Sequence, residues 1–362
     1  MSIRLMYASP EHDADLLYWS RIAVCDRFLA FEVEGRRYAI SNYLEKEVME
    51  QHSGFDEVLL PNDLTQHENP SLIDLIKIIC EKFPTHDLRL PKNFPAHLIL
   101  KLQERNIPFT LQEGEFLPER AIKLPAEVEQ IKKACTIIIK AFEHIRSILS
   151  RAKVVDKILY DHGEILTSER LRSEIGKVCF EGGAIAKETI VACGKDAACP
   201  HHRGIGMLHA NEFIVVDIFP RLIESGYHGD MTRTFLKGEP SEDKLKMYNA
   251  VKKVQSQAIE EICAGKNAKE IHAKNIEMFT NMGYISNDSS GFFHGTGHGV
   301  GLDLHESPSI NTHDHILQVG EVVTVEPGLY YPHIGGVRIE DVILVHEERA
   351  ELLSNFSYDW VV

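Results

Sequence analysis

The sequence contains no apolar run long enough to cross a lipid bilayer as a helix, which takes about 20 residues. Its strongest aliphatic cluster, Ile137–Ile139, lies between Lys133 and Lys140. The N-terminal segment, MSIRLMYASPEHDAD, lacks the apolar centre of a secretory signal peptide. We therefore expect a cytoplasmic protein without a membrane partner.

Basic clusters and paired cysteines are also missing. The chain carries 54 Asp and Glu residues against 39 Lys and Arg residues, a formal net charge of −15 at pH 7. No block of basic residues interrupts this acidity, so no nucleic-acid partner is expected, because a phosphate backbone binds a basic face. The seven cysteines are scattered and form no Cys-x-x-Cys motif. They indicate reduced thiols and argue against a disulfide framework or a thiolate zinc site.

What the chain does contain divides into two parts. Its 362 residues suggest two domains. In the first part, FLAFEVEGRRYAIS predicts two strands joined by a tight turn at the Glu-Gly pair. Pro118 and Pro125 bracket a charged stretch, which indicates a boundary. We assign 1–120 to a small N-terminal α/β domain and 121–362 to a second domain.

The second domain is predicted to be mixed α+β with a strand-rich end. Its apolar segments ETIVAC and EFIVVDIF predict strands, and the last third is rich in Gly, His and β-forming residues. Across the whole chain, the spacing of apolar residues predicts helices over 71–83, 96–106, 126–149, 168–182, 241 to about 265, and 268–282.

Four carboxylates of the second domain stand in or beside apolar strands. Asp217 closes one such strand and Asp230 begins the next, so a hairpin can bring the two together. Glu326 ends the strand TVE, and Glu340 is predicted to lie in the middle of the β-forming run GGVRIEDVILV. Ionised carboxylates are rarely buried without a partner or a metal. If the four converge, cations must offset their repulsion.

Histidines are concentrated in the same part of the chain. Twelve of the 19 lie at or after position 201, and His294, His298 and His305 stand among glycines in HGTGHGVGLDLHE. Four carboxylates and one imidazole form a hard, oxygen-rich ligand set that suits a pair of Mn²⁺, Co²⁺, Fe²⁺ or Zn²⁺ ions. Two such ions, about 3.5–4 Å apart, can hold a bridging hydroxide and polarise a carbonyl group.

The order of these motifs resembles that of the pita-bread metallopeptidases, in the Xaa-Pro dipeptidase (prolidase) and aminopeptidase P branch. The shared series is Asp, GD-x-TRT, HG-x-GH-x-x-G-x-x-x-HE, EPG-x-Y and G-x-RIED, over residues 120–362. The resemblance implies an α+β protein: a small creatinase-like α/β domain followed by a pita-bread catalytic domain with a strongly curved, largely antiparallel sheet. It also implies a homodimer in which the N-terminal domain serves dimerisation and substrate access.

The resemblance assigns roles residue by residue. It makes five residues metal ligands, with the second and last of them bridging the ions: Asp217, Asp230, His298, Glu326 and Glu340. It puts His201 and His305 beside the substrate as catalytic residues, and Glu326 doubles as the proton shuttle. His294 would line the substrate pocket, and Arg338 would be a supporting or substrate-carboxylate-binding residue.

The implied activity is hydrolysis of the Xaa-Pro bond at the N-terminus of dipeptides or short peptides. A metal-bridging hydroxide would attack the carbonyl, and Glu326 would carry the proton to the leaving nitrogen. Two divalent ions are expected, Mn²⁺ first, with Co²⁺, Zn²⁺ or Fe²⁺ as alternatives. Whether the substrate ends at the proline or continues beyond it stays open.

Three other functions fit the sequence less well. A catalytically inactive pita-bread binding protein and a creatinase-like amidinohydrolase, which works without metal, should both lack some of the five ligands. A methionine aminopeptidase would not explain the extra N-terminal domain or the EPG-x-Y and RIED motifs. One departure stands out: Asp217 is followed by Ile218, Phe219 and Pro220, where Asp-x-Gly is usual in the family. We expect a longer hairpin tip there that alters which peptides enter.

Overall fold

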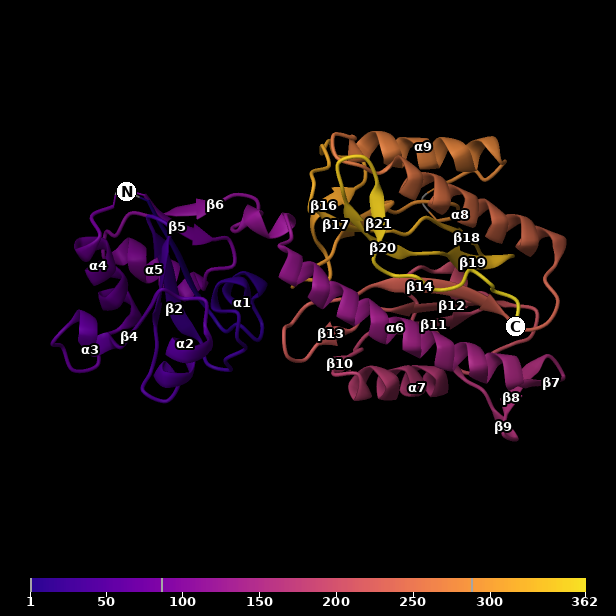
Figure 1. Ribbon diagram of the computed structural model, residues 1–362, viewed down its shortest axis with the longest axis horizontal. Helices are drawn as coiled ribbons and strands as arrows, with labels where there is room; N and C mark the ends of the chain where they lie inside the picture. The colour runs from indigo at the N-terminus through magenta and orange to yellow at the C-terminus, as the bar shows by residue number, and fades with distance from the viewer. Residues whose placement is uncertain (1, 86, 288) are drawn as a thin grey trace. The chain divides into compact units, whose positions relative to one another are not determined.

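Residues 2–85, 87–287 and 289–362 are described by a computed structural model, in which the chain divides into two units (Figure 1). The first unit comprises Met1–Glu119 together with the short segment Glu224–Gly226. The second comprises Arg120–Ile223 and Tyr227–Val362.

The first unit is built on a six-stranded mixed sheet in the order β4-β3-β2-β1-β5-β6. β2 runs antiparallel to β1 and β3, and the other neighbours are parallel. The strands are β1 (Ser2–Ala8), β2 (Phe28–Val33), β3 (Arg36–Ile40), β4 (Glu57–Leu59), β5 (Asp87–Pro91) and β6 (Thr110–Gln112). The predicted hairpin is confirmed, because Glu34 and Gly35 have φ of 51° and 77°, the left-handed pair that a tight hairpin turn needs.

Helices pack on this sheet through apolar faces. They are α1 (Ala14–Ser20), α2 (Lys46–His52), α3 (Pro61–Leu64), α4 (Leu72–Lys82) and α5 (Ala96–Glu104), with a 3-10 turn at Pro118–Ala121. The Ser71 hydroxyl accepts the Asp74 backbone N–H and so begins α4 where the sequence predicts. Ile76 and Ile79 of α4 lie in one buried cluster with Phe31 of β2. The apolar residues whose spacing predicted the helix therefore form the face that the helix buries.

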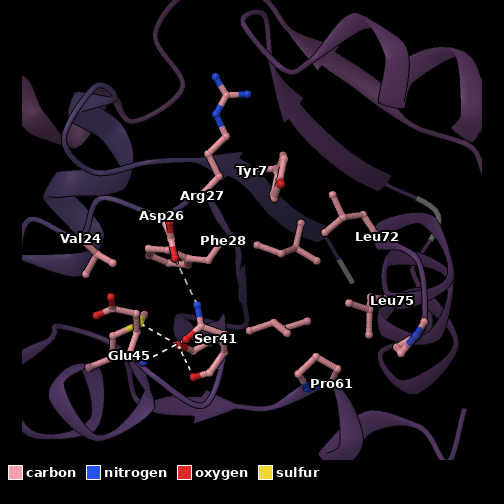
Figure 2. A pocket seen from close by; sticks show the side chains of 15 residues that line it. Tyr7, Val24, Asp26, Arg27, Phe28, Ser41, Glu45, Pro61, Leu72 and Leu75 are labelled. Atoms are coloured by element: carbon pink, nitrogen blue, oxygen red, sulfur yellow. Dashed lines mark hydrogen bonds between the residues drawn. The ribbon is translucent and has the colours of Figure 1, made fainter. Parts of the chain in front are cut away.

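The first unit also contains a small cavity beside the ends of β1 and β3 and the start of α4 (Figure 2). It measures about 250 Å³, and its walls include Ile40 and Leu75. Among its lining residues, the Asn42 side-chain amide donates to Asp26 Oδ2 over 3.4 Å. The residues predicted for catalysis and metal binding lie in the second unit, so this is not the predicted site.

The second unit is organised by four long helices, α6 (Pro125–Arg151), α7 (Ser168–Glu181), α8 (Glu242–Glu261) and α9 (Ala268–Asn281). α6 begins with proline at its first turn and buries Ile131, Ile138 and Ile145, which recur on one face. α6 and α7 lie on one side of the strands, and α8 and α9 lie on the other (Figure 1). Among the described residues, no helix combines the length and the apolar character needed to cross a bilayer.

The strands of the second unit pair antiparallel throughout their named ladders. The sheets that matter for the site are β11-β12-β14, β16-β15-β17-β20-β21 and β18-β19; β7-β8-β9 and β10-β13 are smaller. The bounds are β7 (Lys153–Val155), β8 (Ile158–Asp161), β9 (Glu164–Ile165), β10 (Ala184–Ile185), β11 (Ile190–Cys193), β12 (Phe213–Ile218), β13 (Arg221–Leu222), β14 (Met231–Leu236), β15 (Gly297–Gly299), β16 (Glu306–Ile310), β17 (Val322–Val325), β18 (Gly328–Tyr331), β19 (Gly335–Arg338), β20 (Asp341–Val345) and β21 (Ala350–Leu352), with a 3-10 turn at Asp196–Ala198. The predicted α+β class with an antiparallel second domain is confirmed.

One local prediction is wrong. Glu340 does not lie inside a strand but in the short break between β19 and β20, where the chain passes from the two-stranded to the five-stranded sheet. Its backbone N–H donates to the Thr232 carbonyl over 3.1 Å. Its own carbonyl accepts from the Arg233 guanidinium over 2.7 Å. These two bonds replace a strand ladder at Glu340.

Candidate metal centre and active site

A cavity of about 540 Å³ in the second unit gathers every residue that the sequence predicted for the site. Those lining residues are His201, Asp217, Asp230, His294, His298, His305, Glu326, Arg338 and Glu340. The four carboxylates arrive as two hairpin pairs. Asp217 and Asp230 stand at the paired strands β12 and β14, and Glu326 and Glu340 flank the hairpin β18–β19.

Three of these side chains already form a group that could hold a metal ion. One ligand atom each from Asp230, His298 and Glu340 lies within 4.8 Å of the other two. Asp230 and Glu340 are nearly inaccessible, at 4% and 2% relative exposure. The group therefore combines the predicted imidazole with the predicted bridging carboxylates.

Asp217 is held at the edge of this group by Arg338. The Arg338 Nη2 donates to Asp217 Oδ2 over 2.6 Å. The other carboxylate oxygen of Asp217 is buried and has no hydrogen-bond partner within the described residues. A buried acceptor without a donor is costly, so this oxygen fits a cation that the chain alone does not supply.

Glu326 completes the carboxylate set. Its Oε1 lies 3.3 Å from His298 Nε2, and its backbone N–H donates to the Thr296 carbonyl over 2.7 Å. Burial raises the pKa of Glu326 to about 8; the charge of Arg338 opposes this shift and that of Asp217 adds to it. Without a cation at the site, burial and the neighbouring carboxylate therefore favour the protonated form of Glu326.

Crowding perturbs the other carboxylates in the same sense. Burial raises the pKa of Asp230, and repulsion by Asp217 and Glu326 raises it further. Burial also raises the pKa of Glu340, together with repulsion by Asp230. Hard divalent cations would offset both causes, so the donor set fits the metal pair that the sequence predicts.

The histidines of the cavity favour the neutral form. Burial lowers the pKa of His298 to about 4, and the neighbouring His305 adds to the effect. His298 Nδ1 lies 3.2 Å from the Gly299 carbonyl, which indicates that this nitrogen carries the proton and donates. Nε2 then presents its lone pair toward Asp230, whose Oδ2 is 3.7 Å away. Burial likewise lowers the pKa of His294 to about 3.

His305 and His201 stand beside this centre. The His305 ring is centred 4.2 Å from that of His298 in an edge-to-face arrangement. Its pKa is lowered by burial and by His201. His201 is exposed and lines the cavity.

Arg338 is engaged within the chain on every side. Besides Asp217, its guanidinium donates to the Tyr330 hydroxyl over 2.8 Å and to the Pro200 carbonyl over 3.3 Å. Its Nε donates to the Thr232 hydroxyl over 3.2 Å. These contacts favour the supporting role among the two that the resemblance suggested.

Sequence reasoning assigned no role to Tyr330 or Thr232. The fully buried Tyr330 hydroxyl lies 3.1 Å from His294 Nε2 as well as against Arg338. Thr232 donates to Glu340 Oε2 over 2.7 Å. Both stand inside the motifs TVEPGLY and GDMTRTF, so their positions were the available signal. Phe219, which departs from the family pattern, lines the cavity together with Phe293.

Antiparallel sheets between two pairs of helices, around a cavity of carboxylates and histidines, define the pita-bread class of metallopeptidase. The chain belongs to metallopeptidase family M24, whose model matches residues 129–347. The family and the resemblance found in the sequence therefore agree, and the family implies divalent metal ions.

Two relatives and one solved structure illustrate this membership. The Xaa-Pro dipeptidase of Pyrococcus furiosus is 34% identical over 244 residues, which cover 65% of this chain and 63% of that protein. A putative Xaa-Pro aminopeptidase of Mycoplasma genitalium has the same identity and coverage. The chain thus spans less than two thirds of the length of these curated relatives in the matched segment. The structure of an Xaa-Pro dipeptidase from Bacillus anthracis superposes with a TM-score of 0.84 at 25% identity, over 100% of this chain and 95% of that one.

Proposed function

We propose that this chain is a dinuclear metallopeptidase that hydrolyses the Xaa-Pro bond at the N-terminus of dipeptides or short peptides. The observation that carries the proposal is the clustering of Asp230, His298 and Glu340 within 4.8 Å, with Glu326 Oε1 3.3 Å from His298 Nε2. The names of the two relatives, a dipeptidase and a putative aminopeptidase acting at Xaa-Pro, support the substrate class.

The proposed ligands are Asp217, Asp230, His298, Glu326 and Glu340. Their oxygen-rich character favours Mn²⁺, with Co²⁺, Zn²⁺ or Fe²⁺ as alternatives. When bound, such ions lower the pKa of water and polarise a carbonyl group.

The chain's own residues handle the proton and the developing charge. Glu326 takes the proton of the attacking water and passes it to the proline nitrogen as the bond breaks. This transfer is needed because the nitrogen leaves as a neutral amine only when it gains a proton as the C–N bond breaks. His201 and His305 donate hydrogen bonds to the carbonyl oxygen as negative charge develops, a contribution of about 3 kcal/mol per donor in other enzymes.

His294 and Arg338 position the metal ligand Asp217 and the substrate and take no part in the proton transfer. Arg338 holds one oxygen of Asp217 at 2.6 Å, and the other oxygen, which is buried and has no hydrogen-bond partner among the described residues, is left for a cation. His294, neutral because burial lowers its pKa to about 3, is fixed by the Tyr330 hydroxyl and lines the pocket for the substrate.

The experiment compares an Xaa-Pro dipeptide with an Xaa-Pro-Yaa tripeptide, under each of the four metals and with a chelator. Glu340→Gln should abolish most hydrolysis, because it removes a proposed bridging ligand. Asp161→Asn is the matched control, since Asp161 is a buried carboxylate of the same unit that pairs with Arg151 and Arg170, outside the cavity. Full activity in Glu340→Gln or in the chelated protein would overturn the proposal.

The same measurement separates the rival functions. A binding protein without catalysis would hydrolyse neither peptide under any of the four metals. A creatinase-like amidinohydrolase would be indifferent to the chelator. We also propose a cytoplasmic homodimer in which residues 1–120 serve dimerisation and substrate access; the mass of the particle in solution tests the dimer.

A further inference from the structure

A buried ion pair lies outside the cavity lining but next to two of the proposed metal ligands. Arg233 of β14 is 1% exposed and Asp341 of β20 is 0% exposed. The Arg233 Nη2 donates to Asp341 Oδ1 over 2.7 Å. Neither side chain is among the residues that line the cavity.

The guanidinium of Arg233 joins the two chain segments that carry Asp230 and Glu340. Its Nη1 donates to the Thr232 carbonyl over 2.9 Å and to the Glu340 carbonyl over 2.7 Å. Thr232 in turn donates its hydroxyl to Glu340 Oε2 over 2.7 Å. Because the guanidinium is a rigid planar fork, these bonds fix the separation of the two segments.

Asp341 holds this fork in place through a saturated set of donors. Its Oδ1 also accepts from Ser354 Oγ over 2.9 Å. Its Oδ2 accepts from Gln255 Nε2 over 2.8 Å and from Tyr358 Oη over 2.9 Å. The Arg233 guanidinium further lies over the Tyr358 ring, 4.7 Å from its centroid. α8 and the segment after β21 are thereby tied to the back of the site.

We propose that Arg233 and Asp341 are positioning residues that hold Asp230 and Glu340 at the separation that the metal ions require, and that Tyr358 contributes to metal affinity through them. Metal–ligand distances tolerate deviations of only about 0.2 Å, so a small shift of the Glu340 backbone changes affinity. Stability alone would not explain the arrangement, because a buried ion pair is often no more stabilising than apolar residues of similar volume. The inference rests on the proposed metal site.

The test measures Mn²⁺ binding to metal-free protein by calorimetry, with the Mn²⁺ electron paramagnetic resonance spectrum as a second readout of a coupled ion pair. Asp341→Asn should weaken binding by about 10- to 100-fold, the range for residues that orient metal ligands. Tyr358→Phe removes one hydroxyl and keeps the ring, so it should weaken binding in the same direction by less. Asp161→Asn removes a comparably buried charge elsewhere in the unit and should leave Mn²⁺ affinity unchanged.

The outcomes are distinct. If the folded Asp341→Asn and Tyr358→Phe variants bind Mn²⁺ as the natural chain does, the positioning role is overturned and the metal site stands. If Asp161→Asn weakens binding equally, the effect is general loss of stability, which also overturns the role. If Asp341→Asn does not fold, Tyr358→Phe decides alone. If the natural chain takes up no divalent ion, the proposed function fails and this inference falls with it.

Discussion

Glu306→Gln tests how charge is stabilised beside the cavity. The Glu306 carboxylate accepts from Lys123 Nζ and Arg120 Nη2, each over 2.6 Å, and the three side chains are only 6%, 1% and 9% exposed. Removing one member of such a group leaves buried positive charge without its partner, which costs about 3–5 kcal/mol. In the variant, Arg120 still has Asp303 as a partner and Lys123 still donates to the Ala121 carbonyl. We therefore expect a loss of unfolding free energy at the low end of this range, about 3 kcal/mol.

The effect should depend on pH with a definite sign. Burial alone would raise the pKa of Glu306, but Lys123 and Arg120 outweigh burial and hold it below its ordinary value. A lowered folded-state pKa gives stability that is fully present above the unfolded-state value, about 4.3, and is lost as pH falls through the folded-state value. The gap between natural and variant chains should thus be constant from pH 7 to 5 and shrink below about pH 4.

Urea denaturation followed by circular dichroism at several pH values measures this gap. The control is Glu347→Gln, which removes an exposed carboxylate and should change stability little. A gap below about 1 kcal/mol at pH 7, which is the level of a surface pair, would refute the argument. So would a gap that widens as the pH falls.

Three further predictions concern the core, the cavity and the metal. Phe142→Ala removes a fully buried ring that stacks on the ring of Phe356, with 5.3 Å between the ring centroids. The free energy of unfolding, measured by thermal denaturation, should fall by about 3–5 kcal/mol. A smaller decrease would show that the surrounding core collapses into the space. Tyr330→Phe removes the hydroxyl that is a hydrogen-bond partner of both Arg338 and His294. We expect kcat/KM for an Xaa-Pro dipeptide to fall about tenfold. An unchanged kcat/KM would contradict this prediction. Mn²⁺ at 100 times its Kd should stabilise the metal-free chain by about 2.7 kcal/mol, seen as a higher Tm; an unchanged Tm would contradict specific binding.

Local signals in the sequence were enough for several elements. Ser71 and the apolar spacing after it predicted α4, and the Glu-Gly pair predicted the first hairpin. In both places the information lies within a few neighbouring residues, because a cap or a turn is completed by its own segment. The order of the motifs in turn predicted which residues line the cavity.

Contacts between distant segments could not be predicted in the same way. The break between β19 and β20 at Glu340, where the chain passes from one sheet to another, has no signal in the sequence, because apolar β-forming residues continue on both sides of it. The bonds from Thr232 and Arg233 to Glu340 join residues more than 100 positions apart. No local pattern encodes such bonds, which is why the ion pair behind the site went unseen in the sequence.

The arrival of the carboxylates as two hairpin pairs bears on how the site assembles. Asp230 follows Asp217 by 13 positions and Glu340 follows Glu326 by 14, whereas Glu326 follows Asp230 by 96. The entropic cost of closing a loop rises with the logarithm of its length, so each hairpin makes its own pair cheaply. Bringing the two hairpins together, each with its pair of carboxylates already formed, is then the one long loop that must close. At the proposed site, a metal ion would therefore meet a pair of two-pronged chelators rather than four independent ligands.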